Sequence, residues 1–573
     1  MKYKANFWEC VAVAAFFAVC WAWLFFIVPY RLGFKEQATA FIMRPEFLTQ
    51  YFTKPAFLAV FIGEFLTQFF CLKALGPTLS LLCMALVWYG LVKVLDRLGV
   101  KSGKPTLALL PVVVEMAFIV HLNYPLSATV GLAIAVWMAF GCMCIKNVRS
   151  RMIVFCVAMP VTYILAGGHV ISFAVISVIQ NFRKVLPAFF AVLLGMTAVI
   201  LLGRVYNLSP AGTLTYPIIL GYRLPDTWAL FLGPVCILLV CVMGSLRFKV
   251  WVSSIIVSLS WLAALYSTYN ERAEFEAEIC TKAYRKQWNE VWKMAKDAPD
   301  EYFLGTFYRN LCLARRNQLP DHLLDYHQYP EGGMSIKVEP GMNIMGAFSS
   351  IDQLLAVGDI SQATGCALLG QTAMPNGNSS HLLRRLSELA IVSGEYNVAE
   401  KYLNMLSATI CHGKWAREMK DSLASGMLTE ELRYYRSITS PTDRLYYQND
   451  SYGAAKSILM GNPTGRTAVD YMLCSYLLGK NVNSFCAAFE RYYMGRFVPS
   501  DEVPALYQEA LLVNVNSEES FRRTVAGYGI SEKIASRFID FMDAQTEAAG
   551  DISGLEQFKG TYWYYLVSKK LSD

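Results

Sequence analysis

Three carboxylates stand where a membrane protein can use them for acid–base chemistry. Glu36 follows the first long apolar run, Glu64 lies on an apolar segment between Gly63 and Phe65, and Glu115 stands within another apolar run. A carboxylate such as Glu36 can deprotonate or orient an acceptor hydroxyl that lies within hydrogen-bond reach. An ionisable group inside a bilayer costs about 2–3 kcal/mol, so Glu115 is a candidate acid facing a polar cavity. All three are candidate catalytic residues.

Structural roles compete with these interpretations. Glu36 can equally be a solvated loop carboxylate paired with Arg31 or Lys35, and that role is favoured. Glu115 can be a carboxyl group bonded to a neighbouring helix, where it makes the packing specific, and this role is also favoured. Both alternatives stay open at the level of sequence.

Glu64 has a polar companion on its own segment. Gln68 follows four residues later, which places both side chains on one face of a helix. The pair either binds a lipid headgroup or orients a membrane-associated helix.

Two histidines and two arginines are candidate ligands for a donor or a headgroup. His121 and His169 fall at the ends of apolar runs, and Arg204 and Arg223 are expected on the same side of the membrane. Imidazoles facing one cavity can bind a phosphate or a divalent ion, and an arginine fits a lipid pyrophosphate through bidentate bonds. The plainer roles, water-bonded interfacial histidines and arginines on ordinary headgroups, are favoured.

The elements that must position these residues are membrane helices. The chain is 55% hydrophobic, and its first 270 residues alternate apolar runs with short charged joints. The first run lacks a small-residue cleavage site, so we expect a retained helix. The expected spans are 7–29, 74–93, 105–121, 126–145, 152–167, 169–182, 185–203, 226–246 and 249–269.

The charged joints predict the orientation of these spans. Lysine and arginine collect at alternate joints, for example 93–104 and 146–151, whereas the opposite joints 121–125 and 167–169 lack both residue types. The positive-inside rule then places the N-terminus in the cytoplasm, and nine crossings deliver residues 271–573 to the far side. This distribution explains the net charge of +7 without nucleic acid.

Two stretches leave the count of crossings open. The segment 55–72 is apolar enough to cross, but counting it reverses the later charge bias, so we interpret it as an interfacial or re-entrant helix within a long outer loop, 31–73. The segment 152–182 is short for two crossings. Pro160 and the Gly167-Gly168 pair are expected to break a single helix there.

The second domain, 271–573, reads as soluble helices with a repeat. Gly358 and Gly394 each begin a similar motif, followed by small residues such as Ala363 and Ala399, at an offset of 36 residues. This offset is close to the period of a tetratricopeptide-type helical hairpin. Helices are predicted over 380–392 and 396–408. The sequence therefore predicts an all-α protein, a polytopic bundle over 1–270 followed by helical repeats.

The second domain lacks three common catalytic sequence motifs. It has no glycine-rich phosphate loop, no G-x-S-x-G elbow and no H-E-x-x-H motif. The cysteines show no zinc spacing and no deducible disulfide pattern. The sequence thus identifies no metal site and leaves any cofactor unknown.

One resemblance covers most of the chain. The arrangement is similar to a family of bacterial inner-membrane proteins, common in the Bacteroidota, that is defined only as a domain of unknown function. The matching residues are Lys35-Glu36-Gln37 with Phe41, 63–70, Gln287-Trp288, Asn310-Leu311 with Leu313-Ala314, Arg384-Arg385-Leu386, 394–396 with 399–403, and Lys414-Trp415-Ala416. The resemblance implies a membrane location and helical repeats, and it supplies no activity.

A looser resemblance is to membrane glycosyltransferases that use lipid-linked sugar donors, including protein O-mannosyltransferases with a tetratricopeptide tail. It rests on the first span, the long outer loop and the short loops that follow. In that superfamily a carboxylate soon after the first span serves the acceptor, a role that the resemblance gives to Glu36.

Two functions are therefore carried forward. In the first, the protein sits in the bacterial inner membrane, in contact with lipid, and its periplasmic repeats bind a protein or peptide partner. In the alternative, it is a glycosyltransferase-like enzyme that uses a lipid-linked donor, and the repeats present the acceptor. A transporter is less favoured because no internal duplication is visible.

Overall fold

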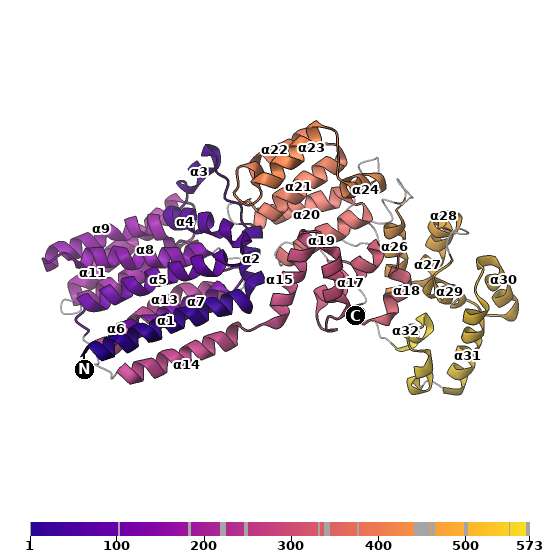
Figure 1. The fold of residues 1–573 in the computed structure, drawn as a ribbon, viewed down its shortest axis with the longest axis horizontal. Coiled ribbons are helices and arrows are strands. Elements are labelled where there is room, and N and C mark those ends of the chain that lie inside the picture. Colours follow the sequence, from indigo (N-terminus) through magenta and orange to yellow (C-terminus); the bar gives the residue numbers. More distant parts are fainter. Residues whose placement is uncertain are drawn as a thin grey trace. The chain divides into compact units, whose positions relative to one another are not determined.

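The fold is helical throughout the part of the chain that the computed structural model describes. That part comprises residues 2–100, 103–181, 185–217, 225–245, 250–329, 333–336, 344–374, 377–439, 459, 465–497, 502–548 and 551–568. The structure is 80% helical, and its described residues contain no β-strand (Figure 1). The all-α prediction is confirmed.

The chain divides into two compact units. The first comprises residues 1–277 together with two short segments of the C-terminal half, 374–380 and 404–418. Its helices are α1 (Lys2–Phe26), α2 (Pro29–Gln37), α3 (Pro45–Tyr51), α4 (Phe57–Thr67), η1 (Gln68–Cys71), α5 (Leu75–Arg97), α6 (Lys104–Leu107), α7 (Leu109–Ile119), α8 (Leu126–Met143), α9 (Val148–Ala166), η2 (Gly167–His169), α10 (Val170–Gln180), α11 (Val185–Val205), α12 (Pro210–Thr215), α13 (Pro225–Ser245) and α14 (Val250–Thr268).

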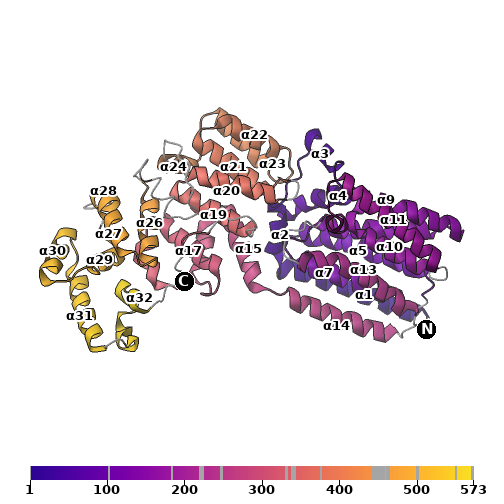
Figure 2. The same ribbon diagram turned by 180° about the vertical axis from the view of Figure 1, so that it is seen from behind.

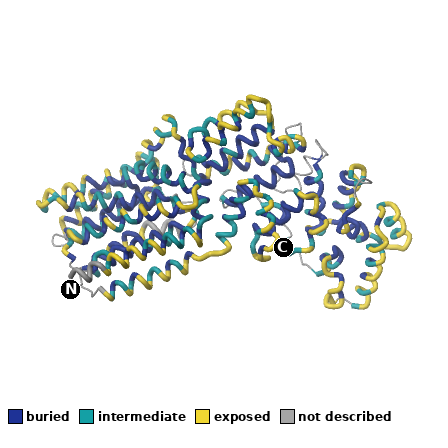
Figure 3. The backbone as a smooth tube through the Cα atoms, in the orientation of Figure 1, coloured by how far each residue is buried: buried dark blue, intermediate teal, exposed yellow. Residues whose placement is uncertain are grey.

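Apolar composition explains why the long helices of this unit form a bundle. In the described residues six helical stretches are long and apolar enough to cross a membrane: Trp8–Phe26, Leu75–Arg97, Leu126–Met143, Val148–Gln180, Leu186–Val205 and Trp251–Thr268. α8 is largely buried in the bundle, whereas little of α14 is buried (Figure 3). Exposed apolar side chains on the outer helices, such as Leu194 and Leu259, suit a lipid environment.

α8 lies at the centre of the bundle because its surface is built of small residues. It packs against α4, α5, α9 and α10. Figure 1 labels α8 beside α5 and α9, and Figure 2, seen from behind, labels α10. A Cβ atom on Gly131 would come within 3.0 Å of the Ala166 carbonyl oxygen, and one on Gly63 of α4 would come within 2.5 Å of the Ser127 backbone. Glycine at these positions therefore permits the close helix contacts that membrane bundles use.

The two ambiguous segments are both helical. α4 has 11 residues, about 16 Å at the usual rise, which is roughly half of a bilayer core. The segment 152–182 is divided into α9 and α10 at Gly167, whose φ of +65° favours glycine. The expectation that Pro160 also breaks this segment is wrong, since Pro160 lies inside α9. Packing by neighbouring helices allows proline within membrane helices.

The second unit comprises 278–373, 381–403 and 419–573. α15 (Glu271–Tyr284) and the helices α21 to α23 contribute residues to both units. The remaining bounds are α16 (Trp288–Lys296), α17 (Phe303–Arg315), α18 (Leu319–His322), η4 (Leu323–Asp325), α19 (Ile344–Val357), α20 (Ile360–Ala373), α21 (Ser380–Ser393), α22 (Tyr396–Ser407), α23 (Gly413–Ala424), α24 (Glu430–Ile438), α26 (Arg466–Leu478), α27 (Val482–Phe489), η6 (Glu490–Met494), α28 (Gly495–Phe497), α29 (Ala505–Leu512), α30 (Glu518–Tyr528), α31 (Glu532–Ala548), η7 (Ile552–Phe558) and α32 (Tyr562–Ser568).

Consecutive helical hairpins account for the 36-residue sequence spacing. Gly358 connects α19 to α20 with a φ of +84°, and Gly394 connects α21 to α22 with a φ of +85°. Both turns therefore use the left-handed conformation that glycine adopts without strain. Ala363 and Ala399 are fully buried near the start of the second helix of each pair. The two predicted helices, 380–392 and 396–408, are confirmed.

Candidate functional site

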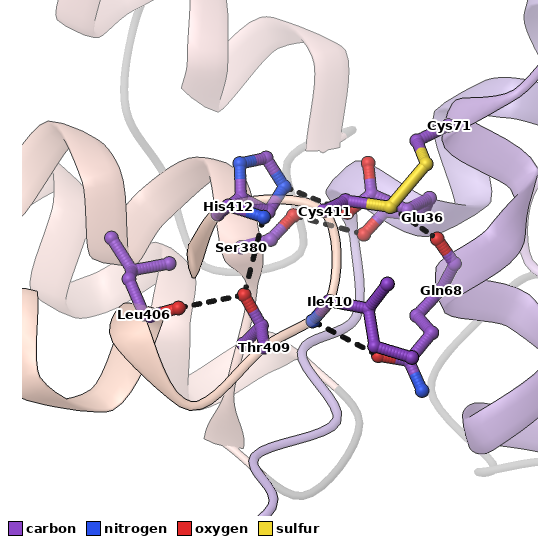
Figure 4. The surroundings of a disulfide bond; sticks show 9 residues. All are labelled: Glu36, Gln68, Cys71, Ser380, Leu406, Thr409, Ile410, Cys411 and His412. Atoms are coloured by element: carbon purple, nitrogen blue, oxygen red, sulfur yellow. Dashed lines mark hydrogen bonds and ion pairs between the residues drawn. A yellow bond between two sulfur atoms is a disulfide. The ribbon is translucent and has the colours of Figure 1, made fainter. Parts of the chain in front are cut away.

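A contact between a carboxylate and an imidazole ties the first loop to the C-terminal half within the first unit. The Glu36 Oε1 atom at the end of α2 lies 2.8 Å from Nε2 of His412, which precedes α23 (Figure 4). Both residues are buried. Glu36 is thus not a solvated carboxylate paired with Arg31 or Lys35, the structural role that the sequence favoured.

A disulfide bond stands beside this pair. Cys71, at the end of η1, is joined to Cys411, the residue before His412 (Figure 4). The backbone N–H of Ile410 donates a 3.4 Å hydrogen bond to Oε1 of Gln68. We call Glu36, Gln68, Cys71, Cys411 and His412 the clasp. Among the described cysteines, the other thirteen form no disulfide.

Backbone contacts extend the clasp on both sides. Oγ of Ser379 donates to the carbonyl oxygen of Gln37 at 2.6 Å, and Oγ of Ser380 donates to that of Glu36 at 3.0 Å. The N–H of Met43 donates to the carbonyl oxygen of Ala408 at 2.9 Å. The Ser379 bond satisfies the last carbonyl group of α2, and the Met43 bond satisfies the carbonyl group that follows α22.

The two cations near Glu36 have other partners. Nε of Arg31 lies 3.2 Å from the Glu274 carboxylate, at the start of α15. Nζ of Lys35 donates to the carbonyl oxygens of Ile119 and Tyr124, at 2.6 and 2.5 Å. Each buried cation is therefore used to hold α2 against another part of the first unit.

Glu64 is held by a tyrosine from the same loop. The Tyr51 hydroxyl donates a 2.5 Å hydrogen bond to Oε2 of Glu64, and both residues are buried. Gln68, four residues later, belongs to the clasp and accepts a hydrogen bond from the backbone N–H of Ile410. Burial and the nearby Glu64 charge raise the pKa of Tyr51, which keeps this hydroxyl a donor.

Glu115 accepts two hydrogen bonds from outside α7. Oε2 of Glu115 lies 2.9 Å from the Tyr124 hydroxyl and 2.7 Å from Oγ1 of Thr129 in α8. Glu115 is 1% exposed. These contacts support the packing role that the sequence favoured over a cavity-facing acid.

The four candidate ligands have different surroundings. His169 in η2 is 2% exposed, and neither ring nitrogen has a hydrogen-bond partner in the described structure. His121 is exposed and packs near Phe118. Arg204 is exposed at the end of α11, and Arg223 falls outside the described residues. No contact between the two histidines appears in the described part of the chain.

Within the described ranges, no group of three or more histidine, cysteine, aspartate or glutamate side chains is arranged to hold a metal ion.

The second unit contains an open pocket of about 580 Å³. The pocket is formed by the connection between α15 and α16 and by residues of α17, α19, α24 and α26. Its charged and aromatic lining includes Lys286, Trp288, Arg315, Glu431 and Tyr434. A pocket of this size fits a small ligand or a chain end, and sequence reasoning did not find it because its residues are far apart along the chain.

Comparison with known protein families assigns the chain to one of them. A family model described as "Family of unknown function (DUF6057)" matches residues 4–569. The chain belongs to this family. Because the match runs through both units, the apolar helices of the first unit and the helical hairpins are parts of one DUF6057 protein. The predicted membership in a family of unknown function is confirmed.

Other comparisons add nothing to the family assignment. Neither the curated proteins nor the solved structures contain a match to this DUF6057 chain.

Proposed function

We propose that this protein is anchored in the bacterial inner membrane and displays a helical domain that binds a protein or peptide partner on the extracytoplasmic side. The observation that carries the proposal is the disulfide between Cys71 and Cys411. Disulfides persist in oxidising compartments and are rare in the cytoplasm. A bond between the loop after the first apolar helix and the C-terminal half supports a common extracytoplasmic location for both.

The binding role is supported by the pocket of the second unit. It is open, and it is lined by charged and aromatic residues such as Trp288 and Tyr434, residue types that often anchor partners. A membrane-anchored domain with such a pocket suits capture of a partner in the envelope.

Reporter fusions at Asp573 test the orientation. We expect alkaline phosphatase fused there to be active and a fluorescent protein exported unfolded to be dark. Matched fusions after Lys146, in a joint expected in the cytoplasm, should give the reverse pattern. A fluorescent and phosphatase-inactive fusion at Asp573 would place the second unit in the cytoplasm and refute the proposal.

A second candidate function is the glycosyltransferase-like reaction, and the Glu36–His412 pair favours it. A carboxylate and an imidazole within 2.8 Å form an arrangement that acid–base enzymes use repeatedly. In this candidate Glu36 or Glu64 activates the acceptor.

Neutral substitutions distinguish the two functions. If Glu36→Gln and Glu64→Gln leave the envelope glycan profile as it is in the wild type, and deletion of the protein alters that profile, these two carboxylates are not the catalytic residues. The control is Glu46→Gln, an exposed carboxylate of α3 in the same loop. A glycan profile that changes with Glu36→Gln alone, at wild-type protein levels, would instead establish the enzyme.

A further inference from the structure

The pocket of the second unit has an arginine with unused donors in its wall. Cζ of Arg315, at the end of α17, lies 4.2 Å from the ring centroid of Trp288. Nη1 donates a 2.8 Å hydrogen bond to the Tyr435 hydroxyl, and Nη2 lies 3.6 Å from the Glu431 carboxylate. A guanidinium has five N–H donors, of which the described structure uses one in a hydrogen bond. Stacking on Trp288 holds the planar group in one orientation.

A second feature of the wall also suits an acceptor. Thr467 lies in the first turn of α26 and lines the pocket. The N-cap residue of this helix is Gly465, which has no side chain to accept the first amide hydrogens. The N-terminal end of a helix attracts negative charge through these amides and the helix dipole. Thr467 thus brings the start of α26 to the wall of the pocket that contains Arg315, although the N–H of Ala468 is already bonded to the Gly465 carbonyl oxygen.

The other charges limit what kind of anion fits. Nζ of Lys286 lies 3.1 Å from Glu388 and 2.6 Å from Glu431, so its charge is already compensated. Glu430 also lines the pocket and is exposed. These carboxylates repel a doubly charged phosphate more than a singly charged carboxylate. They can in turn accept hydrogen bonds from the amides of a peptide.

We propose that this pocket binds the carboxylate end of a peptide, with Arg315 as its bidentate partner and Tyr434 against the adjoining side chain. Tyr434 is 45% exposed, which leaves its ring accessible. The volume of about 580 Å³ suits a chain end and not a folded surface. This inference rests on the proposed function and specifies the partner's chemistry.

The inference is tested by measuring peptide binding to the full-length protein in detergent. Two pools of N-acetylated random hexapeptides are compared, one with free C-terminal carboxylates and one with amidated C-termini. We expect the free-acid pool to bind about tenfold or more tightly than the amidated pool. Arg315→Leu should remove this preference, and Arg315→Lys should restore part of it because the charge remains without the bidentate geometry. Tyr434→Ala, at an exposed site, should weaken binding of both pools.

The neighbouring arginine supplies the control. Arg316 lies over Trp292 at 4.7 Å, in the same kind of stack at the same helix end, but it does not line the pocket. Arg316→Leu should leave binding unchanged. Equal binding of both pools, no binding of either, or displacement of the peptides by millimolar inorganic phosphate would each overturn the carboxylate assignment. The reporter fusions at Asp573 judge the proposed function independently of these results.

Discussion

Arg385→Ala is expected to lower the free energy of unfolding of the second unit by about 3–5 kcal/mol. Arg385 contacts Asp352 at 2.5 Å and Glu388 at 2.8 Å, and all three side chains are at most 3% exposed. Burial raises the pKa of Glu388, but Lys286, Arg385 and Arg384 lower it more, to well below its usual range. Removing Arg385 therefore leaves two buried carboxylates with less compensation. The loss is a large share of the stability of a typical domain.

Thermal unfolding of the purified protein measures this effect. The matched control is Arg522→Ala, whose i,i+4 pair with Glu518 is exposed and should contribute less than about 1 kcal/mol. Replacing Arg385, Asp352 and Glu388 together by apolar residues of similar volume should recover most of the stability, because no unpaired charge is then buried. An Arg385→Ala protein that unfolds at the temperature of the control would contradict this account of the core.

Cys411→Ser is expected to destabilise the first unit by about 2–5 kcal/mol. The bond joins residues separated by 340 positions, so it restricts the unfolded chain strongly. His412, next to Cys411, also loses part of the constraint that keeps it beside Glu36. The unfolding midpoint should fall by several degrees, as judged by tryptophan fluorescence in mild detergent.

The control for this substitution is Cys144→Ser, which changes an exposed free cysteine and should leave the midpoint unchanged. Reductant should lower the midpoint of the wild type toward that of Cys411→Ser and should not affect the variant. Equal midpoints for the wild type and Cys411→Ser in the absence of reductant would mean that the bond does not stabilise the fold.

Local patterns in the sequence predicted the helices well. The helical periodicity around Gly394 predicts every end of α21 and α22 to within one residue, because both the turn and the buried faces are encoded by neighbouring residues. Apolar runs likewise identified the long helices of the bundle. The sequence predicts a helix break at Pro160, but Pro160 lies inside α9. The effect of this proline depends on the helices packed around it and not on its own flanking residues.

Long-range pairing explains what the sequence did not reveal. Glu36 and His412 are 376 residues apart, and nothing in a single sequence connects them. Cys71 had one useful signal, since it is the cysteine of the N-terminal half that falls in the predicted outer loop, but six cysteines of the C-terminal half were equal candidates for its partner. The pocket around Arg315 depends on five separate helix ends and was equally invisible.

The clasp is the centre of this account, and its state in living cells is the most direct test. A protease site can be placed in the exposed turn 316–318, between Cys71 and Cys411 in the sequence. Cells are lysed with excess alkylating agent, and the cut protein is run on a denaturing gel. We predict that the fragments migrate together without reductant, separate with it, and separate in both conditions in Cys411→Ser. Wild-type fragments that separate without reductant would show that these cysteines are not joined, and would remove the main support for an extracytoplasmic second unit.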